Sequence, residues 1–230
     1  DVYKRQEISL SDSIELNPDK NAILAKLSEP VPERLLRVAQ AFRLGLTVNE
    51  IYEACSIDCW FLRQIQVAVE IEKAVSDNGI PENKEDFFQL KRNGFSDARL
   101  AKLSNKSESE ISEIRSNLGI APVFKRIDTC AAEFSANTPY MYSCYEGDGL
   151  NLAECEADPT DKNKVIILGG GPNRIGQGIE FDYCCVHAAY ALSEVGFETI
   201  MVNCNPETVS TDYDTSDTVS YTHLTLPTKA

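Results

Sequence analysis

The feature that most constrains the fold is a short apolar run followed by a glycine-rich turn and a helical pattern. Residues 164–168 read KVIIL, residues 169–178 read GGGPNRIGQG, and an apolar helical pattern continues to about Val195. Gly196 ends that pattern, and a second apolar run, Glu198–Val202, follows it. A strand, a glycine turn, a helix and a second strand in this order predict a β-α-β unit, which is how a parallel α/β sheet begins.

The glycine turn completes neither of two common nucleotide-binding patterns. A dinucleotide fingerprint that starts at Gly169 has Arg174 in its third glycine position, and no acidic residue for a ribose ends the second strand. A P-loop that starts at Gly171 has Gln177 and Gly178 where it needs a lysine and a hydroxyl residue. The turn is therefore expected to bind neither NAD nor the phosphates of a nucleotide.

Residues 28–150 contain the helix start and stop signals of a mainly helical domain. Pro32 and Gly45 stand at the two ends of one helical stripe, and Asp58 is placed to cap a longer helix. Thr47 and Ser107 are each followed three residues later by glutamate, the pattern of a capping box. We expect six short helices, which start near residues 33, 47, 58, 85, 96 and 107.

Residues 123–163 lack a clear period. Aromatic, threonine and alanine residues are mixed over 123–145, and this segment is expected to wrap across a neighbouring domain. Residues 151–163 contain the turn-rich run DPTD and are expected to be a linker. The fold class is thus a mainly α helical domain followed by a truncated α/β unit at 164–217, whose two parallel strands would leave their edges open.

The charge balance argues against some function classes. The chain has 22 Lys and Arg against 36 Asp and Glu, a net charge of −14, which repels the phosphate backbone of nucleic acids. No apolar run approaches the roughly 20 residues of a membrane span. Asp1–Gln6 lack the apolar core of a signal peptide. We expect neither a nucleic acid nor a membrane as a partner.

The cysteines and histidines do not form a metal-site pattern. No two of the eight cysteines are spaced as C-x-x-C, so we expect no metal site, and the cysteines are interpreted as reduced thiols, several of them buried as small hydrophobic residues. His187 lies in an apolar helical stretch and is expected to be a buried core histidine rather than a ligand. Asp212–Asp217 lacks the glycine and the late glutamate of a calcium loop, so we expect a solvated acidic loop.

Five segments resemble the large subunit of carbamoyl phosphate synthetase. Two belong to the α/β unit, GGGPNRIGQGIEFDYC (169–184) and NCNPETVSTDYDTSD (203–217). Three are similar to that family's helical oligomerisation domain, namely IDCWFL (57–62), LKRNGFSDARL (90–100) and KRIDTCAAEF (125–134). The resemblance covers roughly residues 20–217. It implies that the β-α-β unit opens the pre-ATP-grasp domain of the second half, which phosphorylates carbamate.

The resemblance also implies an activity for a larger parent protein. That parent is a cytoplasmic ligase that makes carbamoyl phosphate from bicarbonate, glutamine-derived ammonia and two ATP, for arginine and pyrimidine biosynthesis. It uses ATP with Mg or Mn, held by ATP-grasp segments that are not among these residues. This stretch is therefore expected to hold no cofactor and no catalytic residue and to be inactive alone. The implied partners are other domains of the large chain, the glutaminase small subunit, and further copies through the helical domain.

The family's carbamate tunnel supplies the candidate site residues. Gly178, Glu180 and Glu207 match tunnel-lining positions, where glycine leaves room beside the backbone and carboxylates can hydrogen-bond a small reactive acid. An alternative stays open, in which the two glutamates pair with Arg174 or with an arginine of a neighbouring domain. The glycine-rich loop itself is made by Gly169, Gly170, Gly171, Asn173, Arg174 and Gly176.

The ends of the chain do not fit the family. Residues 1–6 and 218–230 resemble translated sequencing adaptors and are expected to be non-native, and residues 7–27 are assigned to the tail of a preceding ATP-grasp domain. The short helices and turns also permit a second function class, a free-standing helical binding module of helix-turn-helix type. The absence of a basic cluster on the candidate helices argues against it.

Overall fold

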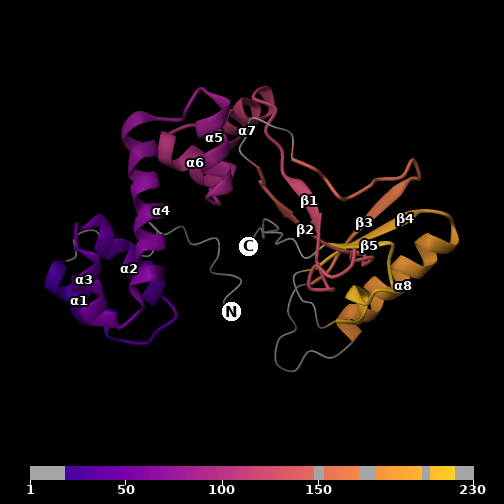
Figure 1. The fold of residues 1–230 in the computed structure, drawn as a ribbon, viewed down its shortest axis with the longest axis horizontal. Coiled ribbons are helices and arrows are strands. Elements are labelled where there is room, and N and C mark those ends of the chain that lie inside the picture. The colour runs from indigo at the N-terminus through magenta and orange to yellow at the C-terminus, as the bar shows by residue number, and fades with distance from the viewer. Residues whose placement is uncertain (1–18, 148–152, 171–179, 204–207, 221–230) are drawn as a thin grey trace. The chain divides into compact units, whose positions relative to one another are not determined.

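The computed structural model describes residues 19–147, 153–170, 180–203 and 208–220 (Figure 1). The chain forms two compact units, Asp1–Ile120 and Ala121–Ala230, which are described separately below. The first is helical and the second contains a sheet, so the predicted class of a helical domain followed by an α/β unit is confirmed. No helix in the described ranges is both long and apolar enough to cross a membrane.

The helical unit contains all six helices expected from the capping pattern, preceded by one more. Their bounds are α1 Lys20–Leu27, α2 Arg34–Arg43, α3 Val48–Cys55, α4 Cys59–Asn78, α5 Lys84–Arg92, α6 Asp97–Ser104 and α7 Glu108–Asn117. The two capping boxes form as expected. Thr47 N donates to Glu50 Oε2 at 2.7 Å, and Ser107 N donates to Glu110 Oε2 at 2.7 Å. These contacts hold the pKa of both glutamates below the ordinary value.

One hydrophobic cluster joins α1, α2 and α3 to the first half of α4. Leu27, Val38, Ile51 and Leu62 are fully buried in it. The sequence of α1 is only weakly amphipathic. The helix is stable in this position because its apolar residues pack against those of the neighbouring helices. Residues 20–27 therefore pack as part of the helical unit, which differs from their assignment to the tail of a preceding ATP-grasp domain.

Two groups of charged side chains connect helices of the helical unit that are distant in the sequence. Glu72 of α4 accepts from Arg43 of α2 at 2.5 Å and from Arg99 of α6 at 2.6 Å. Asp97 accepts from Lys91 at 2.7 Å and from Arg115 at 2.9 Å. Burial by itself would raise the pKa of Asp97, but the hydrogen bonds and charges of the two cations outweigh it and lower the pKa.

The second unit is a five-stranded sheet with one long helix. Its elements are β1 Val123–Arg126, β2 Tyr140–Cys144, β3 Lys164–Leu168, α8 Glu180–Glu194, β4 Glu198–Val202, the 3-10 helix η2 Val209–Thr211 and β5 Thr218–Ser220. The strand order is β1-β2-β5-β4-β3. β3 and β4 are parallel and in register, with Ile166 opposite Ile200 and Leu168 opposite Val202. The predicted β-α-β unit is thus present.

The rest of the sheet differs from the expectation. Residues 123–145 form the hairpin of β1 and β2, and β2 pairs with β5, so this segment lies on the sheet of the neighbouring α/β unit. β5 inserts between β2 and β4 and is parallel to both, so the parallel part is not limited to two strands. Thr218–Ser220 therefore belong to the sheet, which differs from the expectation of a non-native tail from residue 218. The boundary between the compact units lies at residue 120, not at 150.

Part of the expected linker is fixed to the edge of the sheet. Glu156 N donates to Phe124 O at 2.8 Å, and Arg126 N donates to a carboxylate oxygen of Glu156 at 2.7 Å. Lys125 forms an ion pair with the same carboxylate. The hydrogen bond with Glu156 raises the pKa of Lys125, and the same contact lowers the pKa of Glu156. The chain therefore returns along β1 before it enters β3.

The two faces of the parallel strands are covered differently. α8 packs against β3 and β4 (Figure 1), and Thr199 and Met201, which lie on one face of β4, are fully buried. On the opposite face, Ile166 is 60% exposed and Leu168 is 45% exposed. Strands of parallel sheets are normally covered on both faces, so β3 has the sequence of a central strand in an edge position.

Candidate functional site

The candidate site lies at the carboxyl ends of β3 and β4. Gly169 follows β3 directly, and Asn203 follows β4 directly. Because the two strands are parallel, both residues lie at the same edge of the sheet. In open α/β sheets this edge is where ligands bind, outside the carboxyl ends of the strands.

Close approach of the two strand ends requires glycine at position 169. Gly169 N donates to Val202 O at 2.8 Å, which continues the strand pairing by one residue. A Cβ at position 169 would come 2.6 Å from both Cγ and Nδ2 of Asn203. A Cβ at Gly170 would meet nothing within 4 Å. The first glycine is therefore a packing requirement, whereas the second meets no such limit.

Asn203 belongs to a buried group of hydroxyl and amide side chains. Its Nδ2 donates to Thr208 Oγ1 at 3.4 Å, and the Thr208 hydroxyl lies 3.4 Å from those of Ser210 and Thr211. Asn203 N also donates to Ser220 O at 3.0 Å, in β5. The start and the end of the segment between β4 and η2 are thus tied together.

Asp182 connects this group to α8. Asp182 lies in the first turn of the helix and is buried, and its Oδ2 accepts a hydrogen bond from Ser210 N at 2.6 Å. A carboxylate near a helix N-terminus is also favoured by the helix dipole. Asp182 therefore holds η2 against the start of the helix. The sequence motifs do not include Asp182, although an acidic residue in a first helical turn is a recognisable signal.

Only part of the predicted site is described by the structure. Gly169 and Gly170 lie where expected, at the end of β3. Glu180 is the first residue of α8, but the position of its side chain is not described. The other predicted site residues lie outside the described residues, so their roles stay predictions: Gly171, Asn173, Arg174, Gly176, Gly178 and Glu207.

The described part of the site offers packing and hydrogen bonding rather than acid–base chemistry. The described residues contain no group of three or more His, Cys, Asp and Glu that could hold a metal ion. His187 is exposed, and its ring contacts that of Tyr183 in a tilted arrangement with centroids 4.1 Å apart, so the expectation of a buried core histidine was wrong. The turn of α8 that carries it places position 187 on the outer side of the helix.

The described cysteines are free thiols with different surroundings. Cys55 is buried as expected, whereas Cys155 and Cys184 are exposed. Burial, with the nearby charge of Asp182, raises the pKa of the Cys185 thiol. A raised pKa lowers the fraction of a thiol that is present as thiolate at a given pH.

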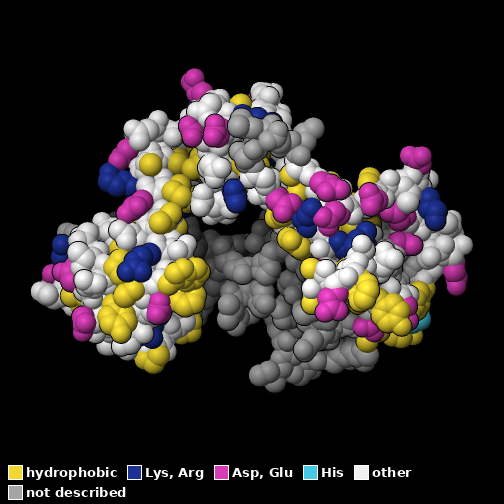
Figure 2. Space-filling view, viewed as in Figure 1, with side chains coloured by type: hydrophobic (Ala, Val, Ile, Leu, Met, Phe, Trp, Pro, Cys, Tyr) yellow, Lys and Arg dark blue, Asp and Glu magenta, His cyan; other side chains and the backbone are white. Residues whose placement is uncertain are grey.

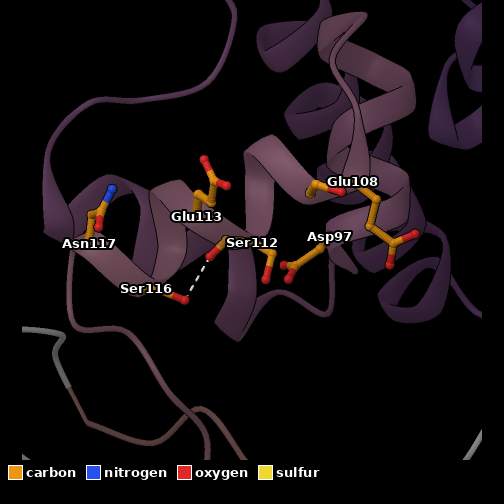
Figure 3. A pocket seen from close by; sticks show the side chains of 7 residues that line it. Asp97, Glu108, Ser112, Glu113, Ser116 and Asn117 are labelled. Carbon is orange, nitrogen blue, oxygen red and sulfur yellow. Dashed lines mark hydrogen bonds between the residues drawn. The ribbon is translucent and has the colours of Figure 1, made fainter.

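A pocket of about 550 Å³ lies in the helical unit, lined by residues of α7 and by Asp97 at the start of α6 (Figure 3). Its lining is polar and acidic, with Asp97, Glu108 and Glu113 among its residues. Asp97 already accepts from Lys91 and Arg115, and the Ser116 hydroxyl donates to Ser112 O of its own helix at 2.8 Å. This arrangement is typical of a solvated helix face.

The fold and the site define a class before any comparison with known proteins. A helical unit precedes an α/β unit in which Gly169 and Gly170 follow β3 at the carboxyl edge of the parallel strands. The class is thus a helical domain followed by a mainly parallel α/β domain.

Two family models match the chain in this order. The carbamoyl-phosphate synthetase large chain oligomerisation domain matches residues 3–119, and the carbamoyl phosphate synthase preATP-grasp domain matches residues 161–229. The chain belongs to the family of carbamoyl phosphate synthase large chains. The matched ranges include residues 7–27, expected to be the tail of a preceding ATP-grasp domain, and residues 218–229, expected to be non-native. Neither matched range includes the β1–β2 hairpin at residues 123–144.

Relatives named carbamoyl phosphate synthase large chain are similar over most of this chain. The protein of Rhizobium meliloti is 54% identical over 95% of the chain, and that of Neisseria meningitidis serogroup B is 60% identical over 90%. The protein of Vibrio parahaemolyticus is 56% identical over 87%. The chain spans about a fifth of the length of these relatives, at 18% to 19%. Nothing in the comparisons supports a free-standing helix-turn-helix module.

Proposed function

We propose that this chain is an internal segment of a glutamine-dependent carbamoyl phosphate synthase large chain. The parent would make carbamoyl phosphate from bicarbonate, glutamine-derived ammonia and two ATP, in the cytoplasm, for arginine and pyrimidine synthesis. The observation that carries the proposal is the order of two matched domains in one chain, oligomerisation at 3–119 and preATP-grasp at 161–229. The names of relatives at 54% to 60% identity agree with it.

The segment would contribute assembly and channel lining rather than chemistry. The helical unit would join copies of the large chain, and the glutaminase small subunit would bind elsewhere in the parent. Gly178, Glu180 and Glu207 would line the passage for carbamate. The buried contacts of Gly169, Asn203 and Asp182 support this role, because they fix the strand ends and the helix start from which those residues extend.

ATP with Mg or Mn would be held by ATP-grasp segments of the parent. Two observations support the absence of an ATP site in this segment. The glycine turn lacks the lysine and hydroxyl of a P-loop, and the residues packed around its start are an asparagine and threonines rather than cations. The glycine at position 169 is accounted for by contact with Asn203.

Calorimetry of the purified chain with ATP and Mg²⁺ tests the proposal. We expect no saturable binding and no ATP hydrolysis. A full-length large chain expressed from the same gene, with its small subunit, should make carbamoyl phosphate from glutamine, bicarbonate and ATP. Saturable ATP binding by the 230-residue chain alone would contradict the assignment of a supporting role.

A further inference from the structure

An exposed aromatic pair begins the longest helix of the helical unit. Trp60 and Phe61 are the second and third residues of α4, and they are 58% and 57% exposed. Their ring centroids are 4.9 Å apart and the ring planes are perpendicular, the edge-to-face geometry that aromatic rings prefer. Trp60 is the single tryptophan of the chain.

The backbone holds the pair in a fixed position. Asp58 caps the helix, with Trp60 N donating to Asp58 Oδ1 at 2.8 Å. Leu62, the next residue, is fully buried in the core cluster, and Ile65 packs against the same cluster. The rings therefore project from a rigid helix start, and they lose little conformational freedom when another surface covers them.

The apolar surface continues along α4. Val67 lies seven residues after Trp60, on the same side of the helix, and is 46% exposed. On the face drawn in Figure 2, hydrophobic side chains gather along α4 and beside the α1–α3 end of the unit. Arg63 follows the pair and is exposed. This combination of two aromatic rings, an aliphatic residue and an arginine is typical of the centre of a protein interface.

The exposed area of the pair is small. With about 150–250 Å² for each aromatic side chain, the exposed fractions correspond to roughly 200–300 Å². A standard interface between free partners buries about 800 Å² on each side. A second copy held by this surface alone would bind weakly. A domain tethered in the same polypeptide binds at a high effective concentration and needs a much smaller contact.

We propose that Trp60 and Phe61 insert into an apolar pocket on another domain of the same large chain, with an acidic residue of that domain facing Arg63. The proposal rests on the proposed function, because it needs a parent polypeptide. The matched segment is about a fifth of the length of the relatives, so most of each relative lies outside it. The pair fixes the helical unit to the body of the synthase, separately from any contact between copies.

Fluorescence of the single tryptophan tests the alternative that a second copy of the chain covers the aromatic pair. In the 230-residue chain, the emission maximum of Trp60 should be that of a solvent-exposed indole and should not change as protein concentration rises. A blue shift that follows the formation of dimers would show that a second copy covers the pair, and it would overturn the proposal.

Hydroxyl-radical footprinting of the full-length large chain tests the proposed occupant. Oxidation of Trp60 and Phe61 should be several-fold slower in the full-length protein than in the 230-residue chain. Equal oxidation rates in the two proteins would overturn the proposal. This readout does not depend on catalysis, so a full-length protein that makes no carbamoyl phosphate would refute the proposed function without deciding the docking result.

A double variant separates docking from folding. Trp60→Ser with Phe61→Ser should change the thermal midpoint of the 230-residue chain by under about 4 °C, because both side chains are exposed. In the full-length protein the same variant should expose the helical unit to limited proteolysis. Leu35→Ser, at a site that is also 58% exposed, is the matched control and should leave the proteolysis pattern unchanged. Identical patterns for the double variant and the control would count against docking.

Discussion

Gly169 lies against Asn203 so closely that a Cβ at position 169 would come 2.6 Å from the Cγ of Asn203. Asn203 is buried and bonded to Thr208, so it has little room to move. The contact sets the distance between the ends of β3 and β4, and with it the start of the glycine turn and of the segment that follows β4.

Gly169→Ala should therefore destabilise the end of the parallel strands. Overpacking of a filled site costs about 1–3 kcal/mol, which corresponds to a roughly 5- to 150-fold faster exchange of amide hydrogens in β3 and β4. Gly170→Ala is the matched control, because a Cβ there meets nothing within 4 Å. Equal exchange rates in the two variants would show that the contact with Asn203 does not determine the stability of the strand ends.

The Glu72 carboxylate is expected to be a main link between α2, α4 and α6. It is 7% exposed and accepts hydrogen bonds from Arg43 and Arg99. Glu72→Ala removes the charge that two guanidinium groups share, and should lower the free energy of unfolding by about 2–4 kcal/mol. Urea unfolding followed by far-ultraviolet circular dichroism, which reports mainly on the helices, measures it.

The exposed pair Lys73–Asp77 on the same helix provides the control for Glu72. Both of its side chains are more than half exposed. Lys73→Ala should change the free energy of unfolding by no more than about 0.5 kcal/mol. A loss as large as that of Glu72→Ala would mean that the helix itself, rather than the shared carboxylate, determines the result.

Asp97 should make the stability of the helical unit depend on acid pH. Its pKa is lowered in the folded state from the ordinary value of 3.8. A lowered pKa favours the folded state wherever the carboxylate is ionised, so the contribution is complete above about pH 5 and is lost as the pH falls below 4 and through the folded-state pKa. Unfolding free energies measured between pH 2 and pH 7 should show this loss.

Asp97→Asn isolates that contribution. The variant cannot ionise at position 97, so it should be less stable than the unmodified chain near neutral pH, and the difference should shrink as the pH falls. Other acidic groups with lowered pKa, such as Glu50 and Glu156, titrate in both proteins and cancel in the comparison. A difference that is constant from pH 2 to pH 7 would contradict the role of the Asp97 charge.

The exposed face and edge of β3 should limit the solubility of the 230-residue chain. Ile166→Lys places a charge on the uncovered face, next to the open edge, and should raise the concentration at which the chain stays monomeric. Ile167→Lys, one residue on, points to the α8 side opposite Met201 and should unfold the sheet instead. Light scattering and circular dichroism separate the two outcomes. Unchanged association of the Ile166→Lys variant would show that the chains do not associate through β3.

The helices could be predicted from the sequence because their limits depend on local contacts. Thr47 with Glu50 and Ser107 with Glu110 lie three residues apart, and each pair satisfies backbone groups of its own helix. The β-α-β unit could also be predicted, since an apolar run, a glycine turn and a helix stop are all consecutive. The helix α1 could not, because its stability comes from contacts of Ile23 and Leu27 with α2 and α3 rather than from its own pattern.

The sequence alone therefore determined the helical unit's caps, the β-α-β order and, through its motifs, the family. Only the tertiary structure decided that Tyr140 pairs with Val219, that Asp182 bonds to Ser210, and that Gly169 must leave room for Asn203. Those residues are far apart in the chain, and their contacts follow from the register of strands that pair across long loops. Local propensity carries no information on that register, since strand pairing is set by which apolar faces can be buried together.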